Sequence, residues 1–148
     1  MIFIIVAVIL SLDQLSKFIV TSNVSYFHPV PVVKDFFYIT LVHNRGAAFG
    51  ILKNQTPLFI FTSLLAIILI ILNLKSGKNR KSYNIFLGLI LAGALGNLID
   101  RVFFGYVIDF LDFRIWPVFN LADSAITVGA VLLGWNILFN KKNVSGNL

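Results

Sequence analysis

Four apolar stretches, each close to the length that spans a lipid bilayer, constrain this chain more than any other feature. They cover residues 1–20, 57–74, 83–99 and 121–139. A helix needs about 20 apolar residues to cross the hydrocarbon core, where its backbone groups must bond to one another. With 58% hydrophobic and 12% charged residues, the composition also lies outside that of soluble domains. The sequence predicts a single membrane domain, residues 1–148, with four transmembrane helices.

The first apolar stretch is expected to remain in the protein. It has no basic segment before it and no small-residue cleavage site, so it does not fit a removable signal peptide. It contains Asp13 and Lys17, which lie on one helix face because they are four residues apart. These two either form an internal ion pair near the helix end or orient polar groups of neighbouring helices around a site. We favour a supporting role over a direct part in chemistry.

The distribution of charge predicts the orientation in the membrane. The cations that decide it are Lys75, Lys78, Arg80 and Lys81 in the short loop 75–82, and Lys141 and Lys142 after the last span. Basic loops stay in the cytoplasm by the positive-inside rule, so this loop and both termini are expected there. The six acidic residues are all Asp, and they fall in the outer loops, 21–56 and 100–120, or in the outer parts of helices.

Composition also excludes several kinds of chemistry. The net charge is +6, but the cations are dispersed between the spans without an aromatic and basic platform, so no nucleic acid partner is expected. Cysteine is absent, which removes disulfides, thiol nucleophiles and thiolate metal sites. Neither histidine belongs to a triad or an HExxH motif, so no metal site is expected.

The first outer loop, 21–56, has the composition of short strands. Residues 32–42 are rich in Val, Phe, Tyr, Ile and Thr and follow two prolines. Thirty-six residues are too many for a helical hairpin and too few for a domain. We expect a small β-sheet on the outer membrane face, so the fold class is mainly α with a small sheet. Its aromatic residues would sit among lipid headgroups. They are Phe27, Phe36, Phe37 and Tyr38.

The same loop contains the segment Asn44–Gly50, where an amide and a cation precede Gly46, two alanines and a second glycine. Small residues let the backbone approach a ligand or another chain closely. The alternative is a tight turn or the start of a re-entrant helix. Spacing alone does not separate these interpretations.

The third span carries a ridge of small residues followed by a polar turn. Gly88, Ala92 and Gly96 recur every four residues, which allows another helix to pack closely. One turn later, Asn97, Asp100 and Arg101 are expected to share a face and to bond to one another. An Asp beside an Arg favours its ionised form, as suits a structural anion.

The segment Gly96–Ser124 holds four of the six acidic residues. They are Asp100, Asp109, Asp112 and Asp123. Asp109 lies between apolar residues, so desolvation is expected to raise its pKa, whereas Asp112 has Arg114 nearby and is expected to be a surface charge. Asn120 is a candidate cap for the fourth helix, and Asp123 would complement its dipole. Capping does not explain why a second carboxylate returns to the membrane surface so soon after Asp109.

Two carboxylates brought together in a medium of low dielectric constant do not both ionise, so they share a proton. One then acts as a base toward water and the other as an acid. This is the chemistry of aspartic peptidases.

Five segments in order resemble the lipoprotein signal peptidase (signal peptidase II) family. They are Asp13–Lys17, Asn44–Gly50, Gly96–Arg101, Val107–Phe110 and Phe119–Ser124. The resemblance implies an aspartic endopeptidase of the bacterial inner membrane that works without a cofactor near the outer leaflet. It implies removal of the signal peptide from prolipoproteins, on the N-terminal side of a diacylglyceryl-modified cysteine. Globomycin-type inhibitors and membrane lipid are the other implied partners, and a monomer is expected.

The same resemblance implies roles for individual residues. Asp109 and Asp123 match the family's catalytic pair. The residues that match its supporting or substrate-binding positions are Asp13, Lys17, Asn44, Gly46, Asn97, Asp100, Arg101 and Asn120. Asp100 is the alternative to Asp109 as the carboxylate that pairs with Asp123. The stretch between Asp109 and Asp123 is shorter than is usual in the family, which bears on loop shape.

The main alternative function is a small ion-coupled transporter in which the same Asp and Asn residues line a path. Such a path needs polar residues across the whole membrane, but the inner halves of the spans are apolar and no inverted repeat is evident. A lipid-binding or assembly protein would not need paired carboxylates. The peptidase is the preferred hypothesis.

Overall fold

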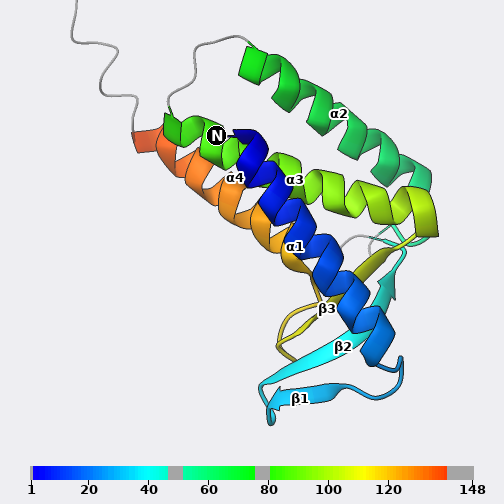
Figure 1. Cartoon of the computed structure of the whole chain (residues 1–148). Coiled ribbons are helices and arrows are strands. Elements are labelled where there is room, and N and C mark those ends of the chain that lie inside the picture. The colour runs from blue at the N-terminus through cyan, green and yellow to red at the C-terminus, as the bar shows by residue number, and fades with distance from the viewer. Residues whose placement is uncertain (1, 47–51, 76–80, 140–148) are drawn as a thin grey trace, which may run out of the picture.

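A computed structural model describes residues 2–46, 52–75 and 81–139 of the chain. In this part of the chain, four helices lie side by side and a three-stranded sheet lies beyond one end of them (Figure 1). The elements in order are α1 (Ile2–Asn23), β1 (Val30–Val33), β2 (Phe37–Asn44), α2 (Thr56–Lys75), α3 (Lys81–Phe104), β3 (Val107–Asp112) and α4 (Leu121–Phe139). All of these helices are long and apolar enough to cross a bilayer. The predicted fold class is confirmed.

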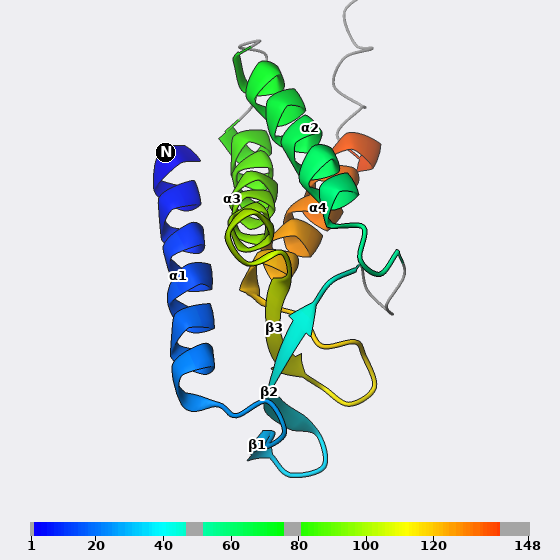
Figure 2. The same cartoon turned by 90° about the vertical axis from the view of Figure 1, so that its right-hand side faces the viewer.

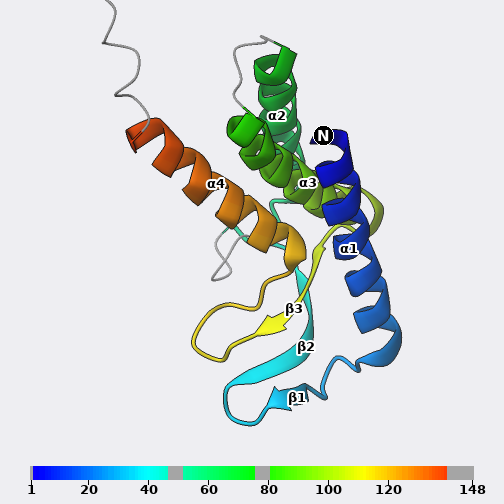
Figure 3. The same cartoon turned by 60° about the vertical axis from the view of Figure 1, so that its left-hand side comes forward.

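Helix α3 is the centre of the bundle. It lies between α1 and α2 in Figure 2 and between α4 and α1 in Figure 3, and it packs against all three. In an apolar 18-residue segment of α3, 56% of the residues are buried, whereas the share in the corresponding segments of the other three helices is 11–17%. The remaining apolar surface of α1, α2 and α4 is therefore available to lipid.

The small residues of α3 face two different helices. Gly88 lies against Ile2 and Ile5 of α1, and Gly96 lies against Asp13 of the same helix. Gly93 lies on another side of α3, where the carbonyl of Ala122 in α4 occupies the place of a side chain. The predicted ridge of small residues thus brings α1 close, and Gly93 does the same for α4.

The sheet has the order β1-β2-β3 with antiparallel pairing throughout. Strands β1 and β2 come from the first outer loop, as predicted. Strand β3 was not predicted, because its sequence VIDFLD lacks a clear alternation of apolar and polar residues. Ile108 and Phe110 pack with Val20 of α1 and Leu41 of β2, and both faces of β3 are covered. Asp109 therefore lies on a fixed strand and not in a loop.

We predict that Gly96→Ala lowers stability although alanine is the better helix former. A Cβ atom at position 96 would lie 2.5 Å from Oδ2 of Asp13, and this carboxylate is held by Lys17 and by the backbone N–H of Ala122. Displacing it costs about 1–3 kcal/mol. Gly134→Ala in α4 is the matched control, because a Cβ atom there meets no atom within 4 Å. Thermal unfolding in detergent micelles measures both. Equal effects of the two substitutions would contradict close packing at Gly96.

Candidate active site

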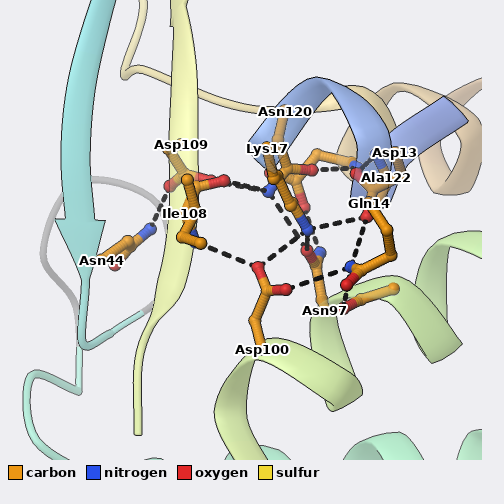
Figure 4. Close-up of polar contacts among 12 residues, drawn as sticks. Asp13, Gln14, Lys17, Asn44, Asn97, Asp100, Ile108, Asp109, Asn120 and Ala122 are labelled. Carbon is orange, nitrogen blue, oxygen red and sulfur yellow. Dashed lines mark hydrogen bonds and ion pairs between the residues drawn. The ribbon is translucent and has the colours of Figure 1, made fainter. Parts of the chain in front are cut away.

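The ammonium group of Lys17 joins α1 to α3. Its Nζ lies 2.8 Å from Oδ2 of Asp13, 2.8 Å from Oδ2 of Asp100 and 3.2 Å from Oδ1 of Asn97 (Figure 4). An ammonium group has three N–H donors, so all of them are used. Only 2% of Lys17 is exposed. The predicted ion pair with Asp13 is present, and it also orients polar groups of α3.

The two carboxylates that bind Lys17 also hold backbone N–H groups of other elements. Asp13 accepts a hydrogen bond of 2.9 Å from the backbone N–H of Ala122, in the first turn of α4. Asp100 accepts one of 3.1 Å from the backbone N–H of Ile108, in β3. These bonds tie α4 and β3 to the centre of the bundle. Both carboxylates are buried and fully engaged.

Gln14 is a member of this network that was not predicted. Its Nε2 donates to Oδ2 of Asp13 and to Oδ1 of Asp100, each over 3.1 Å. It also donates to the backbone carbonyl of Gly96 over 3.3 Å. The available signal was an amide side chain in the same helical turn as Asp13 and Lys17.

Arg101 does not lie where it was expected. Its guanidinium stacks over the ring of Phe59, 4.9 Å from the centroid, and the cation that binds Asp100 is Lys17. Consecutive helix residues point about 100° apart, so Asp100 and Arg101 cannot both face α1. The predicted shared face holds for Asn97 and Asp100, which both contact Lys17.

Asn120 connects the network to both candidate catalytic carboxylates. Its Oδ1 accepts a bond of 2.9 Å from the backbone N–H of Asp123, so it caps α4 as predicted. Its Nδ2 donates to Oδ1 of Asp109 over 2.7 Å and to Oδ1 of Asn97 over 3.1 Å. Asn97 in turn donates to Oδ1 of Asp123 over 2.7 Å. Two asparagines therefore fix the orientation of both carboxylates.

A third asparagine holds Asp109 from the sheet. Nδ2 of Asn44, in β2, donates to Oδ2 of Asp109 over 2.8 Å, and its Oδ1 accepts the N–H of Gly46 over 2.9 Å. The antiparallel register places Asn44 diagonally across from Asp109 on the same face of the sheet. The following motif residues, 47–50, lie outside the described part of the chain.

Burial, and to a smaller extent the nearby charge of Asp123, raise the pKa of Asp109 to about 7. Hydrogen bonds from Asn44 and Asn120 act in the opposite direction, because they stabilise the ionised form. Only 1% of Asp109 is exposed, so desolvation prevails. The predicted rise in its pKa is confirmed.

Asp109 and Asp123 line the same cavity, which has a volume of about 380 Å³. Other polar parts of its wall come from the side chains of Asn44, Asn97 and Arg101 and from Gly46. Apolar residues complete it, among them Phe59, Trp116 and Phe119. Asp13, Lys17, Asp100 and Asn120 lie behind this wall and do not line it. The structure therefore brings Asp109, and not Asp100, to the cavity that Asp123 shares.

A second, mainly apolar cavity of about 540 Å³ adjoins the first. The two share Trp116, Phe119, Asp123 and Thr127. Its remaining lining is Phe36, Phe113, Ile115, Ser124 and Val128. An apolar surface thus leads directly to one of the carboxylates.

Asp112 is not the surface charge that was expected, since only 6% of it is exposed. Its carboxylate accepts the hydroxyl of Thr40 over 2.8 Å and the backbone N–H of Arg114 over 2.9 Å. The guanidinium of Arg114 lies 3.7 Å from it and stacks over Tyr38. Pairing of β3 with β2 covers Asp112, which anchors the turn that leads to Trp116.

In the described residues, 2–46, 52–75 and 81–139, no three His, Asp or Glu side chains form a group that could hold a metal ion. The polar centre of the molecule is instead made of one ammonium, carboxylates and amides.

A family model described as signal peptidase (SPase) II matches residues 5–139. The chain belongs to the signal peptidase II family. It is 50% identical over 131 residues to the lipoprotein signal peptidase of Moorella thermoacetica, covering 88% of this chain and 87% of that one. It is 44% identical over 137 residues to the lipoprotein signal peptidase of Clostridioides difficile, covering 91% and 93%. The predicted class, a membrane aspartic peptidase, is confirmed.

Solved structures agree with this assignment. A bacterial membrane enzyme determined by the in meso method at 2.3 Å resolution is similar to this chain with a TM-score of 0.91 and 31% identity, covering 99% of this chain and 93% of that one. A second such enzyme, at 1.9 Å, gives a TM-score of 0.85 and 32% identity over 94% and 93%. This member of the signal peptidase II family is therefore a multi-pass bacterial membrane protein, and the relatives do not support a transporter.

We predict that Lys17→Met is strongly destabilising in this signal peptidase II chain. The substitution keeps the length of the side chain but leaves Asp13 and Asp100 buried without a cation, which costs about 3–5 kcal/mol. Lys34→Met, in an exposed turn, is the control and is expected to change stability little. Thermal unfolding in micelles compares them. A Lys17→Met variant as stable as Lys34→Met would rule out the central role of the ammonium.

We also predict a pH-dependent stability difference between the wild type and Asp109→Asn. Between the ordinary value of 3.8 and the folded pKa of about 7, the folded state holds a proton that the unfolded state has released. Stability from this group is therefore lost as pH rises from about 4 to 7 and is constant above that range. The free energy of unfolding of the wild type, minus that of Asp109→Asn, should therefore fall by a few kcal/mol as the pH rises from about 4 to 7. Parallel pH profiles would contradict the raised pKa.

Proposed function

We propose that Asp109 and Asp123 are the catalytic pair with which this enzyme cleaves signal peptides from diacylglyceryl-modified prolipoproteins, on the N-terminal side of the lipidated cysteine. One observation carries the assignment: both carboxylates line one cavity and are held there by neutral amides. The proposal takes its substrate from the relatives, which are named lipoprotein signal peptidases.

The chemistry follows from a shared proton. With the pKa of Asp109 near 7, this carboxyl group can gain or lose a proton near neutral pH, and we treat that proton as shared by the pair. The ionised carboxylate takes a proton from water as the water attacks the scissile carbonyl carbon. The protonated carboxyl donates to the carbonyl oxygen. When the tetrahedral intermediate collapses, the C–N bond breaks and a proton from the pair passes to the leaving amine.

The supporting residues divide into two groups by position. Asn44, Gly46, Asn97 and Arg101 line the cavity, and we assign them to contacts with the substrate backbone or with the carboxylates. Asp13, Lys17, Asp100 and Asn120 lie behind the wall and position the groups that line it. Asp100 is thereby assigned to the scaffold, because its oxygens are already bonded to Lys17, Gln14 and the N–H of Ile108.

The apolar cavity next to Asp123 is assigned to the lipid part of the substrate. Phe36, Ile115, Trp116 and Val128 offer a surface suited to acyl chains, and Ile115 and Trp116 are 89% and 60% exposed. The sheet would cradle the peptide on the other side of the carboxylates. Globomycin-type inhibitors are proposed to occupy the same cavities, and the enzyme is proposed to act as a monomer.

We place the protein in the bacterial inner membrane with both termini in the cytoplasm and the carboxylates near the outer leaflet. The start of α1 and the end of α4 lie at the end of the bundle opposite the sheet (Figure 1). Lys75 and Lys81 lie at that end too, as the positive-inside rule requires of a cytoplasmic end. The other cations that carried this prediction lie outside the described residues. They are Lys78, Arg80, Lys141 and Lys142.

Asp109→Asn and Asp123→Asn are each predicted to fold and to lose at least about a thousandfold in turnover, because neither can transfer a proton in the pair. The assay is cleavage of a diacylglyceryl-modified precursor in micelles. Asp35→Asn is the matched control, since Asp35 lies in an exposed turn, and it should remain active. Normal cleavage by either variant would refute the pair. An inactive but stable Asp100→Asn beside an active Asp109→Asn would assign the role to Asp100.

The same assay tests the substrate class. The unmodified precursor should be cleaved far more slowly than the lipidated form, and globomycin should inhibit cleavage. Equal rates for the two precursors would contradict the lipid assignment while leaving the catalytic pair intact.

A further inference from the structure

Arg101 lines the cavity that Asp109 and Asp123 share, but it forms no ion pair with either of them. In the part of the chain that the structure describes, Lys17 and Arg114 pair with aspartates, whereas no aspartate oxygen lies within ion-pair distance of Arg101. A cation that shares a cavity with two carboxylates is attracted to them, and the attraction grows as the local dielectric constant falls. Another contact must therefore hold the guanidinium where it lies.

The ring of Phe59 supplies that contact. The guanidinium of Arg101 lies over this ring, 4.9 Å from its centroid. The face of an aromatic ring attracts a guanidinium, and the attraction is stronger where water is excluded. Phe59 lines the same cavity as Arg101, so the ring and the carboxylates compete for one cation.

The start of α2 fixes the position of this ring. Oγ1 of Thr56, the first residue of α2, donates to the backbone carbonyl of Gly105 over 2.9 Å. The backbone N–H of Gly105 donates in turn to the carbonyl of Arg101 over 3.1 Å. Phe59 is three residues after Thr56, so the two lie on one side of the helix. A helix without an ionisable group before Lys75 is thus anchored beside the cation of the cavity.

Neutral amides occupy the carboxylates in place of that cation. Asp109 accepts hydrogen bonds from Asn44 and Asn120, and Asp123 accepts one from Asn97. A guanidinium paired with either carboxylate would favour the ionised form of the pair. Pairing would therefore oppose the shared proton on which the proposed chemistry depends.

We propose that Phe59 is a positioning residue for Arg101. Its ring holds the guanidinium in the cavity but out of an ion pair with Asp109 and Asp123, so the N–H donors of Arg101 remain available to a carbonyl oxygen of the substrate. This inference rests on the proposed catalytic pair and adds a member of α2 to the machinery around it.

The test depends on which charges act on the two carboxylates. They act on each other, Lys17 of α1 acts on both, and Arg101 of α3 acts on Asp123. Strand β2 contributes the neutral amide of Asn44, and α2 contributes the ring of Phe59. Lys17 is held by two other aspartates, so Arg101 is the charge that a change at Phe59 would release.

Phe59→Leu keeps an apolar side chain and removes the aromatic face. The released guanidinium would pair with a carboxylate, and the shared proton would then be lost at a lower pH. The alkaline limb of the pH profile of kcat/KM, measured with the lipidated precursor in micelles, should move down by about one pH unit. Phe61→Leu is the matched control in the same helix, because Phe61 is 64% exposed and does not line the cavity.

Variants that keep the aromatic ring separate its electrostatic role from its packing. Phe59→Tyr retains the aromatic face and should retain the wild-type profile. Trifluorophenylalanine at position 59 keeps the ring shape but weakens its negative face, so it should move the limb in the direction of Phe59→Leu without disturbing the fold. Thermal unfolding checks the fold of each variant.

The double variant Phe59→Leu/Arg101→Gln identifies the cation as the mediator. Its alkaline limb should coincide with that of Arg101→Gln alone, because no guanidinium remains to be released. NMR of labelled aspartate carboxyl carbons follows the titration of Asp109 without any need for activity. The midpoint of this titration should fall in Phe59→Leu and stay unchanged in Phe61→Leu.

Three outcomes would overturn the role of Phe59. They are a titration midpoint of Asp109 that Phe59→Leu does not move, an equal movement in Phe59→Tyr, and a movement that persists in the double variant. Cleavage that survives Asp109→Asn would instead refute the proposed catalytic pair. In that case the NMR titration still decides whether Phe59 keeps Arg101 away from the carboxylates.

Discussion

The ammonium of Lys17 is the interaction on which the rest of the structure depends. A charge in a nearly dry interior is tolerated only when it is paired and hydrogen-bonded, and here Asp13 and Asp100 both supply that pairing. The triad carries one surplus negative charge. The two carboxylates that carry this charge accept hydrogen bonds from the backbone N–H groups of Ala122 and Ile108. The N–H of Ala122 lies at the N-terminal end of α4, where the helix dipole is positive. Charge balance therefore also locates α4 and β3.

The same side chain serves two purposes in this protein, and the neighbours decide which. Asp13 and Asp100 receive an ammonium and backbone N–H groups, so they join separate elements of the fold. Asp109, in a buried strand, receives the neutral amide donors of Asn44 and Asn120, and its pKa lies near neutrality. Lys17 binds Asn97, and Asn120 bonds to both Asn97 and Asp109. The ammonium therefore supports the geometry of the cavity through these two asparagines, without contacting Asp109.

Local features of this fold were readable from the sequence, and long-range ones were not. The spans, the Asp13–Lys17 pair and the Asn120 cap depend on residues within one or two turns of each other. The burial of Asp112 and the strand β3 depend on pairing with β2, about seventy residues earlier. Arg101 was misplaced because it directly follows Asp100, and consecutive helix residues point about 100° apart, so the two side chains meet different neighbours. The polar turn around Gln14 is visible in the sequence, but its bond to Asp100, 86 residues later, is not.

The Asp13–Lys17 pair has a consequence for how the protein enters the membrane. These two charges neutralise each other within a single helix, so α1 can be inserted before any other span exists. Asp100 has no cation on the same face of α3, and its partners Gln14 and Lys17 belong to α1. In the folded protein, α3 therefore depends on α1 for the cation and the amide that bind its buried carboxylate.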